Sequence, residues 1–247
     1  MNLADHQRQR IESLRRLAGK IAHDFNNILT TMTGYADLLA MDGALSTDSR
    51  ECVDEIKRSV EKAGRLTGQL LTFSRNELTR TERIDVNILM RNLEPRLRST
   101  LGEDVEIEMD LGNAVPPVCS DPQRLEEAVL LLAQNARDAM PRGGVFAAAT
   151  LAAAVNGTRQ AAVPPAGTHA VIELRDTGCG LDEETAERIF EPFFSTRDNP
   201  DKPGLGLTRA WTTVLQSGGF IRCSNLPEGG ALFQIYLPAW RSETREP

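Results

Sequence analysis

Apolar residues recur at helical spacing through the first third of the chain. One stripe of three- and four-residue steps runs through residues 5–41, and a second runs through residues 53–73. The breaker Asp42-Gly43-Ala44-Leu45-Ser46 separates them, with Ser46 or Thr47 as the cap of the second helix. The pattern predicts a tight antiparallel helical hairpin. The first stripe contains Leu14, Ala18, Ile21, Phe25, Ile28 and Met32, and the second contains Val53, Ile56, Val60, Ala63, Leu66, Leu70 and Phe73.

His23 lies inside the first predicted helix but away from its apolar stripe. At about 100° per residue, His23 and Asn27 fall on the opposite face, so the imidazole is expected to point into water. A hairpin offers each stripe only one neighbouring helix. We therefore expect a second copy of the chain to cover the remaining apolar surface, which gives a homodimer with a symmetric four-helix bundle. The alternative is that the hairpin packs against the C-terminal region of its own chain.

Beyond residue 78 the pattern changes to short β-rich runs among amphipathic helices. This change predicts a hairpin domain over residues 1–78, a separate α+β domain over 79–240 and a polar tail over 241–247. Strands with helices gathered on one face form a two-layer sandwich. We expect strands at 83–86, 105–109, 145–155, 169–175, 219–224 and 232–237, helices at 87–101, 121–140, 182–190 and 205–217, and a surface hairpin loop at 156–167.

Composition narrows the classes of function. Of the 247 residues, 40% are hydrophobic, which is ample for a folded core. The net charge of -7 provides no basic surface for nucleic acid. The apolar runs are far shorter than the ~20 residues of a membrane span, and the N-terminus has no secretory pattern. We therefore expect a cytoplasmic protein without a membrane segment, in which the four scattered cysteines are free thiols.

The second domain contains residues whose chemistry suits a nucleotide. Asp176 ends an apolar strand, and Gly178 and Gly180 let the following backbone turn tightly. Asn135 lies on a strongly apolar helix, where an unpartnered amide is costly and where Mg²⁺ beside phosphates is a suitable partner. Gly204 precedes a helix whose first N–H groups can bind phosphates. The plainer alternatives are a strand-ending turn at Asp176 and a backbone-capping asparagine at 135.

Six motifs follow one another in a fixed order. Any single motif is weak evidence, but six in order are strong. The order resembles the H, X, N, G1, F and G2 boxes of sensor histidine kinase cores, closest to the NtrB-like and hybrid-kinase group, and the resemblance covers about residues 10–240. The motifs are His23-Asp24-Phe25-Asn26-Asn27, Leu70-Leu71-Thr72-Phe73-Ser74-Arg75, Asn135-Ala136-Arg137-Asp138-Ala139-Met140, Asp176-Thr177-Gly178-Cys179-Gly180, Phe190-Glu191-Pro192-Phe193-Phe194 and Gly204-Leu205-Gly206-Leu207.

The resemblance implies a GHKL (Bergerat) ATP-binding fold for the second domain, with ATP and Mg²⁺ as its ligands. In that family the residue that matches Asp176 accepts a hydrogen bond from the adenine amino group, and the residue that matches Asn135 is the Mg²⁺ ligand. Residues 195–203 would form a lid over ATP, from which Arg197 would contact a phosphate. The nucleotide-binding set is then Asn135, Asp176, Gly178, Gly180, Arg197, Gly204, Leu205, Gly206 and Leu207.

The implied reaction is ATP-dependent phosphorylation of His23. Nε2 of the neutral imidazole would attack the γ-phosphate, while Asp24 accepts a hydrogen bond from Nδ1-H and fixes the tautomer. The phosphoryl group would then pass to an aspartate on the receiver domain of a response regulator. Asp24 and Asn27 also match the family's phosphatase motif, in which Asn27 would orient water against the phosphoaspartate of the regulator.

Two positions depart from the family pattern. Leu131 replaces a common second asparagine, and Lys202 with Pro203 replaces an expected glycine. Related ATPases such as gyrase, MutL and Hsp90 have a glutamate at the position of Leu131 that activates water, which leucine cannot do. A free-standing ATPase is therefore disfavoured. The other alternative is a phosphotransfer or scaffold protein with a decayed ATP site, in which His23 relays phosphate from another kinase.

Overall fold

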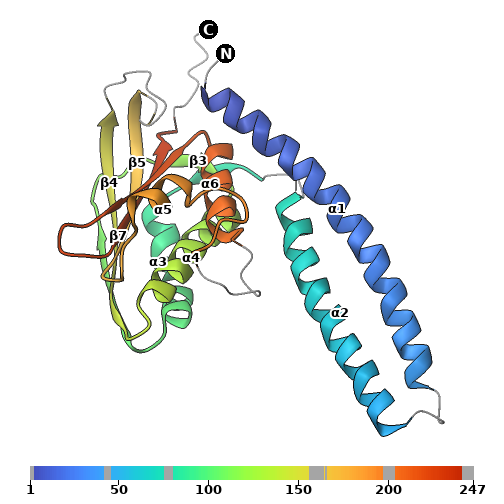
Figure 1. The fold of residues 1–247 in the computed structure, drawn as a ribbon. Coiled ribbons are helices and arrows are strands. Elements are labelled where there is room, and N and C mark those ends of the chain that lie inside the picture. The colour runs from blue at the N-terminus through green and yellow to red at the C-terminus, as the bar shows by residue number, and fades with distance from the viewer. Residues whose placement is uncertain are drawn as a thin grey trace. The chain divides into compact units, whose positions relative to one another are not determined.

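The computed structural model describes residues 3–41, 46–74, 80–155, 164, 166–196 and 204–240. The chain divides into two compact units, one built on a helical hairpin and the other on a five-stranded sheet. This architecture confirms the predicted fold class of a helical hairpin followed by an α+β sandwich (Figure 1). Each helix that the structure describes is too polar or too short to serve as a membrane span.

The hairpin consists of α1 (Leu3–Ala40) and α2 (Thr47–Ser74). Ser46 caps α2, because its Oγ accepts a hydrogen bond from the Ser49 backbone N–H at 3.2 Å. The face of α1 that packs on α2 contains small residues, Ala22 and Ala36, both of which are buried. Four residues of the predicted stripe lie beside this face instead of within it, since Ile21, Phe25, Ile28 and Met32 remain 40%, 52%, 56% and 44% exposed, whereas Ala18 of the same stripe is buried.

The sheet unit has strand order β2-β4-β5-β7-β6, in which β2 is parallel to β4 and the other neighbours are antiparallel. A small second sheet pairs β1 with β3, a three-residue strand that was not predicted because it is too short to show alternation. The elements are β1 (Glu82–Ile84), α3 (Val86–Leu101), β2 (Val105–Leu111), β3 (Val118–Ser120), α4 (Pro122–Ala139), β4 (Gly144–Val155), β5 (Gly167–Asp176), α5 (Glu183–Arg188), α6 (Gly206–Gln216), β6 (Phe220–Asn225) and β7 (Ala231–Pro238).

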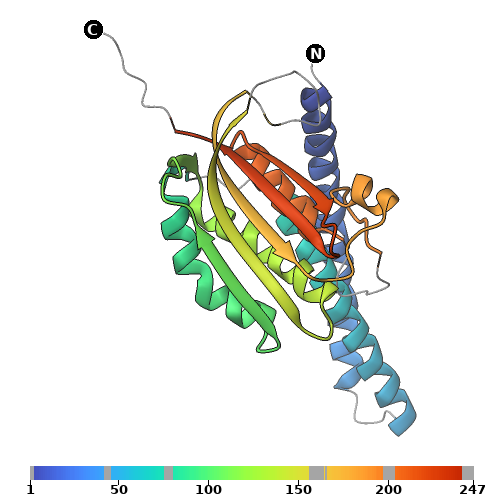
Figure 2. The same ribbon diagram turned by 90° about the vertical axis from the view of Figure 1, so that its left-hand side faces the viewer.

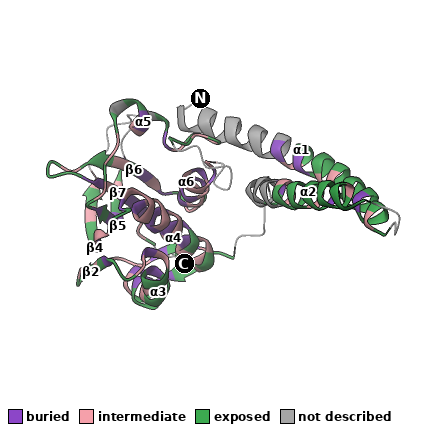
Figure 3. Ribbon diagram, turned by 60° about the horizontal axis from the view of Figure 1, so that its bottom comes forward, coloured by how far each residue is buried: buried purple, intermediate pink, exposed green. Residues whose placement is uncertain are grey.

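Helices α3, α4 and α6 cover one face of this sheet, and the opposite face is open to the viewer in Figure 2. The core forms between the two layers, where buried residues concentrate in Figure 3. Alternation with period two appears in β4, because Phe146, Ala148 and Thr150 are buried while Ala147 and Ala149 are less so. Asp121 caps α4 by accepting from the Arg124 backbone N–H, with Pro122 in the first turn.

Candidate functional site

His23 is exposed on α1, as its helical phase predicted. The side chain of His23 is 72% exposed and that of Asp24 is 62% exposed. His23 Nδ1 lies 3.3 Å from Asp24 Oδ1 and 3.5 Å from Asn27 Nδ2. The same nitrogen cannot both donate to Asp24 and accept from Asn27. The shorter separation and the charge of the carboxylate favour the tautomer of the neutral ring with its proton on Nδ1, in which the free lone pair belongs to Nε2.

Asp176 is a buried carboxylate at the end of β5. It is 2% exposed, and its Oδ1 accepts hydrogen bonds from the backbone N–H groups of Gly178 at 2.9 Å and Ala231 at 3.3 Å. Burial raises the pKa of this carboxyl, and the two backbone donors act in the opposite direction because they favour the ionised form. Both donors meet the same oxygen, so the orientation of the carboxylate is set by the backbone around it.

The turn after Asp176 requires glycine at two positions. A Cβ on Gly178 would lie 2.7 Å from Ala139 Cβ and 2.9 Å from the Ala139 carbonyl oxygen. Gly180 has φ +68°, a left-handed conformation that residues with a side chain rarely adopt. The Ala139 carbonyl also accepts from the Cys179 backbone N–H at 3.3 Å. The turn is therefore fastened closely to the C-terminal end of α4.

Asn225, at the end of β6, holds the same turn and was missed by the sequence analysis. Its Oδ1 accepts from the Leu181 backbone N–H at 2.8 Å, and its Nδ2 donates to the Leu181 carbonyl. The two bonds imitate a strand pairing for the residue that follows Gly180. Asn225 is 44 positions from Leu181 and comes just before a Gly-containing turn. The sequence therefore shows only a turn asparagine there.

Helix α4 connects the two glycine clusters. Leu131 Cδ2 lies 3.6 Å from the position that a Cβ on Gly206 would take, and Ala139 contacts the turn at Gly178. Asn135 is half-buried midway between Leu131 and Ala139. These two residues are eight positions apart, which corresponds to about 12 Å along a helix. That span is on the scale of an extended nucleotide with its phosphates.

The last predicted cluster leads into α6. Gly204 has φ +70°, and α6 begins at Gly206, so its first backbone N–H groups lack partners within the helix. Leu207 packs against the core of the sheet unit. Arg197, Lys202, Pro203 and most of the predicted lid lie outside the described residues.

The structure thus groups the predicted residues into two sets. Asn135, Asp176 and the glycine turn at Gly178 belong to the sheet unit together with the start of α6, while His23 and its neighbours lie on the hairpin.

Two family models match the chain. The His Kinase A (phospho-acceptor) domain matches residues 13–79, and the histidine kinase-, DNA gyrase B- and HSP90-like ATPase matches residues 120–241. The chain belongs to the histidine kinases.

Proteins similar to this chain are sensor kinases, which confirms the resemblance that the motifs indicated. The kinase core is 37% identical over 241 residues to the sensor kinase CckA of Brucella abortus (strain 2308), covering 97% of the chain and 26% of CckA. It is 28% identical over 237 residues to the sensor histidine kinase ZraS of Klebsiella oxytoca, covering 95% of the chain and 48% of ZraS. The chain therefore spans between a quarter and a half of these curated relatives.

The fold of the kinase core also matches a solved structure. Full-length ShkA, crystallised in complex with AMPPNP, superposes with a TM-score of 0.58 at 22% sequence identity. The match covers 90% of this chain and 45% of the ShkA chain. At this identity the likeness concerns the fold, and it includes both the hairpin and the sheet unit.

Proposed function

We propose that this histidine kinase core phosphorylates its own His23 from ATP and passes the phosphoryl group to an aspartate of a response regulator. The observation that carries the proposal is the exposed imidazole whose Nδ1 lies against Asp24. Nε2 forms a bond to the γ-phosphorus while the bond to the β,γ-bridging oxygen breaks, and ADP leaves. Asp24 stabilises the imidazolium charge that develops during attack. ATP is a cytoplasmic substrate, so the proposal assigns this region to the cytoplasm.

The residues around Asp176 would bind the nucleotide. Because Gly178 and Ala231 both donate to Oδ1, Oδ2 is left to accept from the adenine amino group. The tight turn at Gly178 and Gly180 has no side chains at these two positions, so its backbone would approach a planar base closely. The first N–H groups of α6 would bind the phosphates. The AMPPNP complex of the structural relative ShkA supports this assignment. The proposal also includes a contact between Arg197 and a phosphate, as the resemblance implies.

Asn135 fits a Mg²⁺ ion that arrives with the nucleotide. Its amide oxygen is the hard ligand that Mg²⁺ prefers, and Mg²⁺ commonly takes one or two protein ligands plus substrate phosphates. Among the residues that the structure describes, no group of three or more His, Cys, Asp or Glu side chains could hold a metal by itself. The bound ion would neutralise charge that develops on the phosphates.

Asn27 supports a second activity of the same helix, hydrolysis of the phosphoaspartate on the regulator. Its amide is exposed one turn after His23, with Nδ2 3.5 Å from the imidazole. An amide in that place can hold a water molecule in line with a phosphorus atom docked beside His23. Removal of Asn27 would then slow dephosphorylation of the regulator while leaving phosphorylation of His23 intact.

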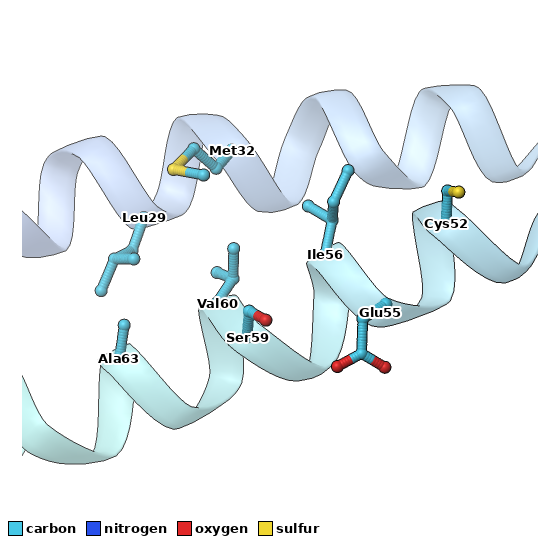
Figure 4. A pocket seen from close by; sticks show the side chains of 8 residues that line it. All are labelled: Leu29, Met32, Cys52, Glu55, Ile56, Ser59, Val60 and Ala63. Carbon is cyan, nitrogen blue, oxygen red and sulfur yellow. The ribbon is translucent and has the colours of Figure 1, made fainter. Parts of the chain in front are cut away.

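A second copy of the chain is the proposed partner of the hairpin. The stripe from Ile21 to Met32 is exposed, and it continues in Tyr35, which is 67% exposed. Beside it lies a groove of about 400 Å³ between α1 and α2. An apolar surface of this extent is typical of an interface, and a hairpin covers it most simply with an identical hairpin. Figure 4 shows the lining residues Leu29, Met32, Cys52, Glu55, Ile56, Ser59, Val60 and Ala63.

Incubation with γ-labelled ATP and Mg²⁺ tests the kinase reaction. The wild-type chain should acquire an acid-labile label that is absent from His23→Gln and Asn135→Ala. Asn113→Ala is the matched control, since Asn113 is exposed in the turn after β2, and it should label normally. A chain that takes no label from ATP but accepts it from a phosphorylated receiver domain would be a relay. Phosphate release that persists in His23→Gln, without any label, would indicate an ATPase.

Transfer to a regulator is tested with the labelled chain and isolated receiver domains from the same genome, added one at a time. Rapid movement of label from His23 to one receiver supports the proposal. The receiver variant that lacks its acceptor aspartate should leave the label on His23. Retention of the label with every receiver would contradict the transfer step while leaving the kinase step standing.

A further inference from the structure

A buried polar contact joins α1 to α2 beside His23. The Thr67 hydroxyl lies 2.6 Å from Asn26 Oδ1 and can donate to it, although the two residues are 41 positions apart. Thr67 is only 8% exposed, and Asn26 is half-buried. Asn26 follows His23 by three residues, which is less than one helical turn. The contact therefore ties the turn that carries His23 directly to the second helix.

The contact interrupts a regular packing seam. Residues on the facing sides of the two helices repeat every seven positions, the pattern of helices that pack along their length. Thr67 takes the place of an aliphatic residue in its row. A polar pair at one seam position specifies register, because a shift of one helix leaves its groups unpaired. The row on α1 is Ala22, Leu29 and Ala36, and the row on α2 is Val53, Val60 and Thr67.

Thr67 also has acceptors within its own helix. The carbonyl oxygens of Ala63 and Gly64 each lie 3.1 Å from Thr67 Oγ1. A hydroxyl has one proton to donate, so Thr67 bonds either to Asn26 or to its own helix. When the contact with Asn26 breaks, the Thr67 hydroxyl can rotate and donate to one of these backbone carbonyls, so no buried donor is left unsatisfied. The contact can therefore break and form again while the hydroxyl always has an acceptor.

We propose that Asn26 and Thr67 form a latch, a positioning pair that sets the orientation of the His23 turn relative to α2. The inference rests on the proposed function, because orientation matters only if His23 Nε2 attacks in line. Neither residue contacts the reacting atoms. A misplacement on the order of 1 Å can slow a reaction by about 100-fold. Loss of the latch leaves the aliphatic seam intact, so we expect a smaller decrease of about tenfold.

The test compares variants of the 247-residue chain by the rate of His23 labelling at saturating ATP and by KM for ATP. Asn26→Ala and Thr67→Val should each lower kcat about tenfold with KM changed by less than about twofold, and the double variant should be no slower than either. Thr67→Ser keeps the hydroxyl and should restore the rate. Thr100→Val is the control, since the Thr100 hydroxyl donates to the Arg96 carbonyl of its own helix at 2.9 Å.

Additive losses in the double variant, a change confined to KM, or unchanged rates would overturn the latch and leave the kinase proposal standing. A wild-type chain that takes no label would overturn both. Circular dichroism melts identify any variant that unfolds at the assay temperature. Asn26→Ser, which stays polar but is too short to reach Thr67, replaces Asn26→Ala in that event and should show the same loss of kcat.

Discussion

Replacement of Ile28 by alanine should weaken self-association of the hairpin. Ile28 is 56% exposed on the apolar stripe of α1. Full burial of an isoleucine contributes about 1.5–3 kcal/mol, so burial of its exposed half against a second copy is worth roughly 1 kcal/mol. A symmetric dimer loses this contribution twice, about 2 kcal/mol in total. At 1.4 kcal/mol per factor of ten, the dissociation constant should rise about 30-fold.

Sedimentation equilibrium over a range of concentrations measures this change. Ile88→Ala is the matched control, because Ile88 is 54% exposed but lies on α3 in the sheet unit. The control should keep the wild-type dissociation constant. Equal weakening by both substitutions, or a wild-type chain that stays monomeric at every concentration, would refute the assignment of the α1 stripe to a second copy.

Three further results are expected. Asp176→Asn should abolish ADP binding but raise Tm at pH 7, because burial raises the pKa of Asp176 and its ionisation therefore destabilises the folded state. The difference in Tm between variant and wild type, measured by scanning fluorimetry, should shrink as the pH falls toward about 4. Asn225→Ala frees the Leu181 backbone and should raise Kd for ADP about tenfold by calorimetry, with kcat unchanged. Iodoacetamide at pH 8 should modify exposed Cys179 but spare Cys223, because burial, aided by the charge of Asp176, raises the pKa of Cys223 to about 12. Peptide mass spectrometry distinguishes the two cysteines, and ATP should slow the modification of Cys179 alone.

The sequence predicted the elements of the fold well because their signals are local. Capped helices such as α4, with Asp121 before Pro122, and strands with alternating burial such as β4 depend on residues a few positions apart. The side of α1 that meets α2 was harder to predict. Hydrophobicity marks the stripe around Ile28, whereas the hairpin itself buries the small residue Ala22. A pattern shows which face is apolar but not which neighbour covers it.

The sequence indicated candidate site residues where the signal lies in neighbouring positions of the chain. Asp176 and its glycines form one continuous motif, and its end-of-strand position follows from the apolar run before it. Asn225 and Thr67 act through contacts between segments that are 44 and 41 positions apart. Their types, a turn asparagine and a helix threonine, are ordinary at those positions. Only the folded arrangement shows that Asn225 holds the turn after Asp176 and that Thr67 contacts the turn of His23.

Leu131 bears on the choice between an active kinase and a relay with a decayed ATP site. Together with Lys202, its departure from the family pattern was the support for the relay. In the structure the Leu131 side chain lies against Gly206 at the first turn of α6 and packs on the core. An apolar side chain there supports the backbone that would bind phosphates, and it has no group that could activate water. The substitution is therefore compatible with phosphoryl transfer to His23 and unfavourable to hydrolysis, which removes half of the sequence-based support for the relay.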